Sequence, residues 1–159
     1  MVSITVYDEA VAYGRMIPVR MGKHVSMVKP PRQREYQDWV RHVAFDSYHE
    51  QMGQDAPLLD EALVLSVRVY RQIPQSFSKR KAALAAEGLV MPTSKPDLDN
   101  YIKLVLDALT GVVWEDDSLV VGYERTGKYY TKDQPHTWIR IWTLGEIIMQ
   151  RQKQQEERK

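Results

Sequence analysis

Hydrophobic and polar residues follow regular spacings in several segments of the first half of the chain. Val2–Tyr7 has valine or isoleucine at every second position, which predicts a strand with one buried face. From Pro31 to about residue 51, apolar side chains recur at helical spacing and predict an amphipathic helix. Ala62–Tyr70 is rich in aliphatic and β-branched residues, which predicts a well-buried strand. The helix is expected to bury Tyr36, Trp39, Val40, Val43, Ala44 and Ser47.

The second half of the chain predicts further helices and strands. Ser76 or Ser78 suits the N-cap of a short helix that ends at Glu87 before Gly88. Leu98–Leu109 is expected to form a helix that stops at Thr110 and Gly111. Alternating patterns then predict a pair of strands joined by a turn, followed by a polar tail that is a frayed helix end or disordered. These segments are Leu119–Arg125, His136–Leu144, the turn near Lys132–Pro135, and the tail 150–159.

The predicted order of elements is β-α-β-α-α-β-β, which favours the α+β class. A chain of 159 residues is long enough for one domain with a substantial core. We therefore expect a single domain over residues 1–149, with a mixed β-sheet and helices packed mainly on one face. Residues 10–34 contain several glycines and prolines and are expected to form a long, mobile loop.

The composition narrows the class of protein. The 43% hydrophobic and 27% charged residues are ordinary for a globular protein. No apolar run approaches the roughly 18 residues of a membrane span, and the N-terminus does not resemble a signal peptide. The absence of cysteine excludes disulfides, thiolate metal ligands and a cysteine nucleophile. We expect a cytoplasmic protein with no membrane partner.

The net charge is only +1, but the basic residues are unevenly distributed. Residues 10–34 contain no acidic residue, and a second basic group lies just before the Leu98–Leu109 helix. Such segregated charge can attract phosphate groups, or it can simply be solvated surface. The candidate DNA-binding residues are Arg15, Arg20, Lys23, Lys29, Arg32, Arg34, Lys79, Arg80 and Lys81.

The Leu98–Leu109 helix has apolar residues on two sides and a narrow charged stripe between them. Asp99, Lys103 and Asp107 are four residues apart and lie in line on a helix of about 3.6 residues per turn. This stripe is either the lining of a groove or an ordinary ladder of ion pairs. In the second interpretation Asp97 is simply the N-cap.

Further carboxylates favour a metal site. Asp97 and Asp99 lie on either side of the predicted helix start, so capping explains only one of them. A second acidic pair, Asp116 and Asp117, follows the turn after the helix, where a strand can run back beside it. Crowded carboxylates repel one another unless a cation binds them, and oxygen ligands suit Mg²⁺ or Mn²⁺. Tyr101 excludes an EF-hand loop, and no glycine-rich phosphate loop occurs.

The stretches KPDLDNYIKLVLDALTGVVWEDDSLV and IPQSFSKRK closely resemble the RusA family of Holliday-junction resolvases, which is found in bacteria and their phages. The resemblance is firm over residues 62–141 and looser before them. It implies a small homodimer that binds four-way DNA junctions and nicks two strands symmetrically with Mg²⁺, or alternatively Mn²⁺. Leu119 and Tyr101 depart from the residues usual in the family, which puts substrate preference in doubt more than activity.

The resemblance also implies roles for individual residues. The metal-binding acids of the family correspond to Asp97, Asp99 and Asp117, and its conserved lysine corresponds to Lys103. Asn100, Asp107 and Asp116 match motif positions and are expected to support them, with Asp107 orienting Lys103. The predicted function is metal-dependent resolution of four-way junctions in DNA recombination and repair. The alternatives are a non-catalytic, junction-binding architectural protein and a less selective nuclease of branched or flap DNA.

Overall fold

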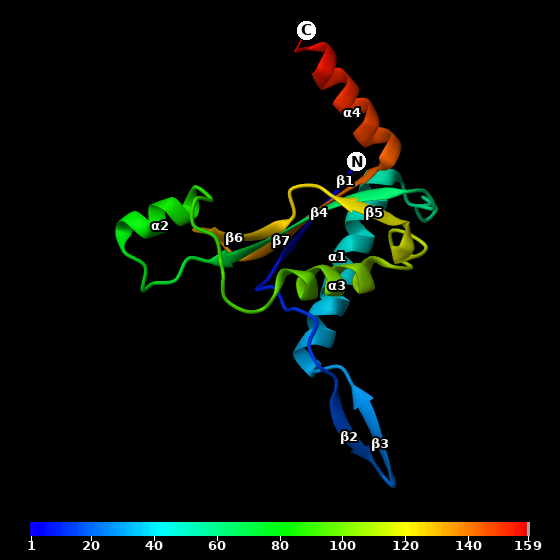
Figure 1. Ribbon diagram of the computed structural model, residues 1–159. Coiled ribbons are helices and arrows are strands. Elements are labelled where there is room, and N and C mark those ends of the chain that lie inside the picture. The colour runs from blue at the N-terminus through cyan, green and yellow to red at the C-terminus, as the bar shows by residue number, and fades with distance from the viewer. Residues whose placement is uncertain (159) are drawn as a thin grey trace.

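The computed structural model describes residues 1–158 and consists of one mixed sheet, a separate hairpin and helices around them (Figure 1). The strands are β1 (Val2–Tyr7), β2 (Ile17–Met21), β3 (His24–Val28), β4 (Leu63–Gln72), β5 (Val120–Tyr123), β6 (Gly127–Thr131) and β7 (His136–Thr143). The α-helices are α1 (Pro31–Met52), α2 (Lys79–Ala86), α3 (Leu98–Leu109) and α4 (Leu144–Glu156), and a short 3₁₀ helix, η1, spans Asp117–Leu119. The predicted α+β class with a mixed sheet is confirmed.

Strand β4 is the centre of the sheet, whose order is β1-β7-β4-β5 with β6 also paired to β4. Strand β7 is antiparallel to both β1 and β4, whereas β5 and β6 are parallel to β4. Strand β5 pairs with the first residues of β4, from Leu63, and β6 pairs with the last, from Arg68 to Gln72. The two parallel strands therefore lie at opposite ends of the same strand.

One face of this sheet forms the hydrophobic core together with α1 and α3. Alternate residues of each strand point to this face, since side chains in a strand change sides at every residue. On α1 the buried stripe is Tyr36, Val40, Ala44 and Tyr48, while Trp39, which we expected on it, is 43% exposed. Burial raises the pKa of Tyr36 to about 12, and its hydroxyl contacts that of Thr137 at 3.0 Å. The fully buried core residues of the sheet include Ile4, Leu63, Leu65, Val67 and Ile139.

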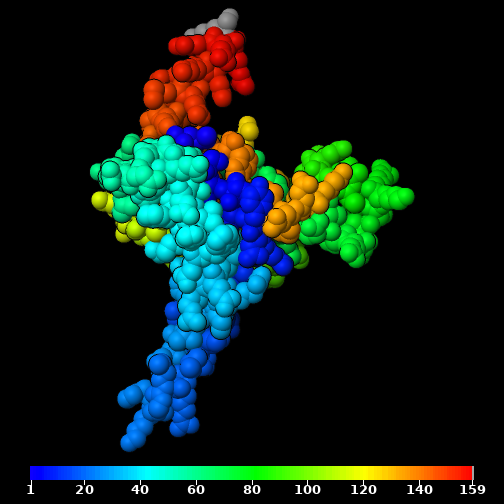
Figure 2. Space-filling view, turned by 180° about the vertical axis from the view of Figure 1, so that it is seen from behind, coloured from blue at the N-terminus to red at the C-terminus, as the bar shows by residue number. Residues whose placement is uncertain are grey.

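Residues 10–34 were expected to form one long loop, but the middle of this segment is a pair of strands. Strands β2 and β3 form an antiparallel hairpin that turns at Gly22 and Lys23, and Gly22 has a φ of 63°. Figures 1 and 2 show the hairpin, α2 and α4 each projecting from the body of the molecule. The hairpin exposes Ile17, Val19, Met21, Val25 and Met27. These apolar side chains are open to solvent in the single chain, where a two-stranded hairpin is marginally stable by itself.

The C-terminal part also differs from the prediction. Three strands are present where two were expected, because β6 lies between β5 and β7 in the sequence. In the sheet, β5 and β7 lie on opposite sides of β4. Helix α4 runs to Glu156, which agrees with the first of the two alternatives expected for the tail 150–159, a helix end. Lys159 lies outside the described residues. No helix within residues 1–158 combines the length and the apolar character needed to cross a membrane.

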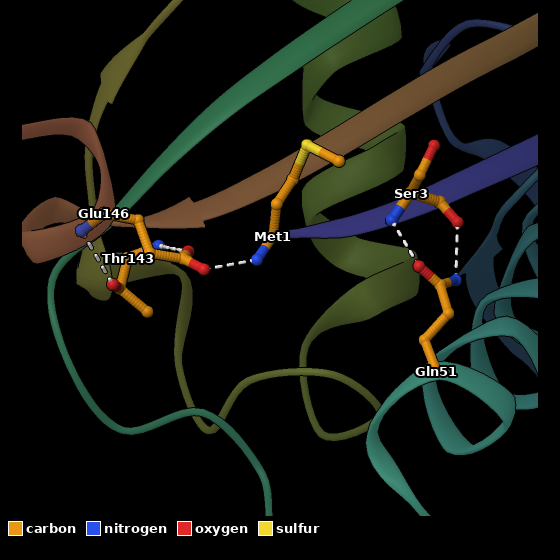
Figure 3. Close-up of polar contacts among 5 residues, drawn as sticks. All are labelled: Met1, Ser3, Gln51, Thr143 and Glu146. Carbon is orange, nitrogen blue, oxygen red and sulfur yellow. Dashed lines mark hydrogen bonds and ion pairs between the residues drawn. The ribbon is translucent and has the colours of Figure 1, made fainter. Parts of the chain in front are cut away.

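Polar contacts tie the first strand to the helices at that end of the sheet (Figure 3). The Gln51 amide of α1 accepts a hydrogen bond from Ser3 N at 3.0 Å and donates one to Ser3 O at 2.7 Å. Thr143 and Glu146 form a capping box at the start of α4. The Glu146 carboxylate also contacts the amino group of Met1. The strand β1 is thereby joined to both α1 and α4.

Removing core volume beneath α3 is expected to destabilise the fold. Leu104 of α3 is fully buried in the core cluster that α3 shares with α1 and the sheet. We expect Leu104→Ala to lower the free energy of unfolding by about 2–5 kcal/mol through reduced burial and the cavity left behind. Urea unfolding monitored by circular dichroism measures this, with Leu89→Ala as control because Leu89 is 70% exposed and should change stability by about 0.5 kcal/mol or less. Equal effects of the two substitutions would contradict this packing.

Candidate active site

Asp97 and Asp99 lie together at the start of α3, and both side chains are exposed. Asp97 occupies the N-cap position, but its side chain makes no capping hydrogen bond. Its carboxylate instead accepts a hydrogen bond from Lys95 Nζ at 2.6 Å. That hydrogen bond raises the pKa of Lys95, and the charges of Asp97 and Asp99 raise it further. The ammonium group of Lys95 thus lies directly against the carboxylate of Asp97.

Basic side chains of the sheet hold the backbone that leads into α3. Arg71 near the end of β4 donates to Ser94 Oγ at 3.2 Å and to Lys95 O at 3.3 Å. Lys128 of β6 donates to Ser94 O at 3.0 Å and to Pro96 O at 3.1 Å. The carboxylates of Asp97 and Asp99 are therefore presented from a segment fixed to β4 and β6. Sequence reasoning missed Lys95, Arg71 and Lys128, and only the position of Lys95 next to the motif signalled its role.

Lys103 and Asn100 contact the segment that precedes the hairpin. The backbone of Asn100 accepts a hydrogen bond from Tyr13 N at 2.9 Å. The Nζ of Lys103 lies 4.1 Å from the centre of the Tyr13 ring, which is a cation–π contact. Lys103 itself remains exposed. Its ammonium group is thus oriented by an aromatic ring one turn along α3 from Asp99.

Asp107 does not orient Lys103 as expected. Its carboxylate pairs with Lys29 Nζ at 3.7 Å, and its carbonyl accepts a hydrogen bond from Arg41 at 3.1 Å. Lys29 also donates to Gln37 Oε1 at 2.8 Å. Asp107 and Lys29 therefore join α3 to α1 and to the base of the hairpin, and the ladder of ion pairs along α3 is not formed within residues 1–158.

Asp116 and Asp117 begin η1, after the tight turn that ends α3. Asp116 Oδ1 accepts a hydrogen bond from Ser118 N at 2.8 Å, and the hydrogen bonds from Ser118 hold the pKa of Asp116 below its usual value. Asp116 thus caps the 3₁₀ helix. Asp117 is exposed. Burial raises the pKa of Tyr123, and the nearby negative charge of Asp117 raises it further.

One chain does not bring Asp117 to Asp97 and Asp99. Asp117 lies just before β5, which pairs with β4 from Leu63, whereas the segment before Asp97 is held by Arg71 near the other end of β4. Leu63 and Arg71 are about 26 Å apart at the rise of an extended strand. Figure 1 likewise shows the chain entering α3 on the side of β6 and leaving it on the side of β5. Among residues 1–158, no three His, Asp or Glu side chains gather closely enough to hold one metal ion.

The candidate DNA-binding residues fall on two projecting elements and the start of α1. Arg15, Arg20 and Lys23 are exposed on or beside the hairpin, and Arg32 and Arg34 are exposed in the first turn of α1. Lys79, Arg80 and Lys81 are exposed in the first turn of α2, where Ser78 accepts the capping hydrogen bond from Lys81 N at 3.2 Å. Lys29 differs from them because it is already paired inside the chain.

Comparison with known proteins places this arrangement in a family. Residues 9–142 match the family described as Endodeoxyribonuclease RusA. The chain is also 38% identical over 135 residues to the uncharacterized protein YqaN of Bacillus subtilis (strain 168), which covers 83% of this chain and 89% of that protein. The match includes α3, both acidic pairs and the whole of β4 to β6. The chain belongs to the RusA family of Holliday-junction endodeoxyribonucleases.

Proposed function

We propose that this protein is a homodimeric, Mg²⁺-dependent endodeoxyribonuclease that resolves four-way DNA junctions by nicking two strands. The observation that carries the proposal is the exposed carboxylate pair Asp97 and Asp99 at the start of α3, where Asp97 already binds the ammonium of Lys95. Membership of a family of Holliday-junction endodeoxyribonucleases supports the substrate class. The proposed role is in DNA recombination and repair, in the cytoplasm.

The donor set at the start of α3 fits a hard divalent cation in part. Asp97 and Asp99 offer carboxylate oxygens that are open to solvent, and these are ligands that Mg²⁺ selects, with Mn²⁺ as an alternative. When bound, such an ion stabilises negative charge on the phosphate and lowers the pKa of bound water. The third expected ligand, Asp117, does not reach them within one chain. A complete set of three acids therefore requires a second chain.

A two-fold dimer about α3 supplies the missing acid. Helix α3 is about 18 Å long at 1.5 Å per residue, with Asp97 and Asp99 at its start and Asp117 beyond its end. If two copies of α3 pack antiparallel, the end of one helix lies beside the start of the other. Each site would then contain Asp97 and Asp99 of one subunit and Asp117 of the partner subunit. The symmetry of such a dimer matches the paired, symmetric cuts made in a four-way junction.

Residues on α3 support this contact. Leu98, Ile102 and Leu106 are only half-buried in the single chain and lie on adjacent turns of the helix. Their remaining apolar surface would become buried against the same residues of the second copy. Lys103, next to this surface and held by Tyr13, would then face the shared site, where its charge can stabilise the phosphate.

The basic residues of the hairpin, of the start of α1 and of α2 are proposed to bind the DNA backbone. Contacts with phosphates position a protein on DNA without reading its sequence, which suits recognition of a branch. Because the hairpin and α2 project from different parts of the body (Figure 2), one subunit can reach separate arms of a junction.

Removing any one of the three acids is expected to abolish cleavage and spare binding. The variants Asp97→Asn, Asp99→Asn and Asp117→Asn should cut a synthetic four-way junction in Mg²⁺ at least roughly 100-fold more slowly, because even the partners of metal ligands cost 10–100-fold. Junction binding without divalent metal should stay within about threefold of wild type, since these acids face the metal and not the phosphate-binding arms. The exposed Asp55→Asn is the matched control.

The substrates in that assay separate the proposal from its alternatives. Tight binding with no metal-dependent nicking by the wild type would indicate an architectural protein. Equal cutting of junction, flap and linear duplex would indicate a less selective nuclease. Full cleavage by one of the three variants would remove that residue from the site.

Mixing inactive variants tests whether the site is shared between subunits. When Asp97→Asn and Asp117→Asn chains exchange, each mixed dimer keeps one intact site, so about a quarter of the wild-type nicking sites should return. The nicked products, resolved on a denaturing gel, would come from one strand per dimer. Mixing Asp97→Asn with Asp99→Asn should restore nothing, because both changes affect the same half of the site. No recovery in either mixture would place all three acids within one subunit and leave the proposed activity standing.

The basic turn of α2 is expected to bind phosphates of the DNA backbone. Replacing Lys79, Arg80 and Lys81 with alanine should weaken junction binding and flatten its salt dependence, by about 0.9 in the slope of log K against log salt for each phosphate that is no longer neutralised. Fluorescence anisotropy at several salt concentrations measures the slope. An unchanged slope would show that α2 does not touch the backbone.

A further inference from the structure

The face of the sheet opposite α1 and α3 is largely uncovered. On this outer face, neighbouring residues of β4 and β7 are paired across the antiparallel ladder. Helix α4 covers only one end, where Ile147 packs against Val64 and Trp142. The outer face consists of Val64, Ser66, Arg68 and Tyr70 of β4, His136, Trp138, Arg140 and Trp142 of β7, Tyr129 of β6 and Tyr7 of β1.

A hollow of about 300 Å³ lies between this face and α4, and its lining is strongly basic. Four arginines, Arg68, Arg125, Arg140 and Arg151, contribute to it together with one acid, Glu124. The carboxylate of Glu124 pairs with Arg151. Within residues 1–158 the other three arginines have no carboxylate at ion-pair distance. The hollow, which is called the arginine hollow below, therefore carries uncompensated positive charge.

Two residues that line the arginine hollow each carry a buried donor without a hydrogen-bond partner in the described part of the chain. The donors are Arg140 Nε and the indole Nε1 of Trp142, whose side chain is only 9% exposed. Both groups can donate and neither can accept. The four guanidinium groups of the lining offer further N–H donors, so the hollow suits a ligand with several acceptor oxygens. A phosphate group provides these oxygens together with the negative charge.

Two of the arginine side chains, those of Arg68 and Arg140, are held in place before any ligand arrives. The guanidinium of Arg140 lies 3.8 Å from the centre of the Trp138 ring, and that of Arg68 lies 5.0 Å from it. Arg68 Nε also donates to the carbonyl of Arg125 at 3.1 Å. Arg125 adopts a φ of 45°, a left-handed conformation uncommon for a residue with a side chain. In this backbone conformation the carbonyl of Arg125 accepts the hydrogen bond that orients Arg68. Residues with such strained backbone angles are often found at binding sites.

Aromatic rings continue the outer face away from the arginine hollow. The ring of Tyr70 stacks on His136 with centroids 4.5 Å apart and on Tyr129 at 5.4 Å, and Tyr7 lies 5.7 Å from His136. From Trp142 to His136 the row extends about 20 Å along β7. A mononucleotide is too short for this row. Positive grooves bordered by aromatic rings are typical of proteins that bind single strands, because every base has a face that can stack.

We propose that the outer face binds a single strand of DNA, with a backbone phosphate in the arginine hollow and bases against the aromatic row. The site is on the opposite side of the sheet from α3 and its acids, so its binding does not depend on cleavage. A second copy of the chain is a poor occupant, since a symmetric contact would bring two arginine hollows together and like charges repel.

The test measures binding of a fluorescein-labelled single strand of about 15 thymidines to the full chain in EDTA, by anisotropy. Arg125→Gly removes a guanidinium while glycine keeps the left-handed backbone, and it should weaken binding about tenfold, as expected for removal of a charge-assisted hydrogen bond. Arg151→Gln should weaken binding by a similar factor. Lys153→Gln is the matched control, because it removes the same charge from the same helix outside the hollow, and it should stay within about twofold.

Competition experiments test separately the preference for a single strand, the contribution of the bases and the binding of a phosphate. Unlabelled single strand should compete better than duplex of equal length, and an abasic strand should bind more weakly than thymidine. Inorganic phosphate should compete against wild type more strongly than chloride at equal ionic strength, and lose this advantage with Arg125→Gly. Thermal unfolding checks that each variant is folded.

Several results would overturn the proposal. If Arg125→Gly bound the single strand as tightly as wild type, the arginine hollow would not be the phosphate site. If Arg151→Gln and Lys153→Gln lost the same affinity, binding would depend only on the overall charge of the protein. Equal competition by duplex and single strand would remove the preference for an unpaired strand. A change of oligomeric state in sedimentation velocity without a change in DNA affinity would make the outer face a contact between copies. Since no metal is present in this assay, failure of the proposed cleavage would leave these affinities unchanged.

Discussion

The pairing of β4 with three neighbours is the constraint on which the rest of the molecule depends. Its ladder with β7 runs from Leu63 to Tyr70, and the parallel strands β5 and β6 occupy the opposite ends of its other edge. Because side chains alternate along a strand, this register sends Leu63, Leu65 and Val67 into the core and sends Ser66 and Arg68 to the outer face. A shift of one residue would exchange these two sets and destroy both surfaces.

The same strand sets the distance between the two acidic groups of the site. Asp97 and Asp99 follow a segment fixed by Arg71 near one end of β4, and Asp117 precedes the strand that pairs at the other end. Moving these groups together within one chain would require breaking one of the parallel pairings. The dimer proposed above is less disruptive, since it needs only surface that is already half-buried on Leu98, Ile102 and Leu106 of α3. The exposed apolar hairpin gives a second region that a partner can cover.

Sequence patterns were sufficient where local spacing determines the element and insufficient where a distant strand does. The bounds of β1 and α3 follow from alternation in Val2–Tyr7 and from the apolar stripes of Leu98–Leu109. The β2–β3 hairpin was missed because Pro18 lies within its first strand. Strand β6 was missed because it pairs with β4, which is far away in sequence. The carboxylates of the site are recognisable as motif residues, whereas Arg71 and Lys128, which hold the motif, come from strands whose position only the folded sheet determines. The path of the chain after α3 also could not be predicted from local sequence patterns. Strand β5 could lie beside the helix or beside β4, and only long-range packing decides between them.

The separation of charge between the two faces explains why a net charge of +1 is uninformative for this protein. Acids that would repel phosphate are gathered at the ends of α3, where a cation can offset them, and Lys95 already does so for Asp97. The arginines of the outer face are kept from these acids by the thickness of the sheet and its core. A single sheet can thereby separate carboxylates on one side from guanidinium groups on the other, and alternation along β4 and β7 is the physical reason that the two do not neutralise each other.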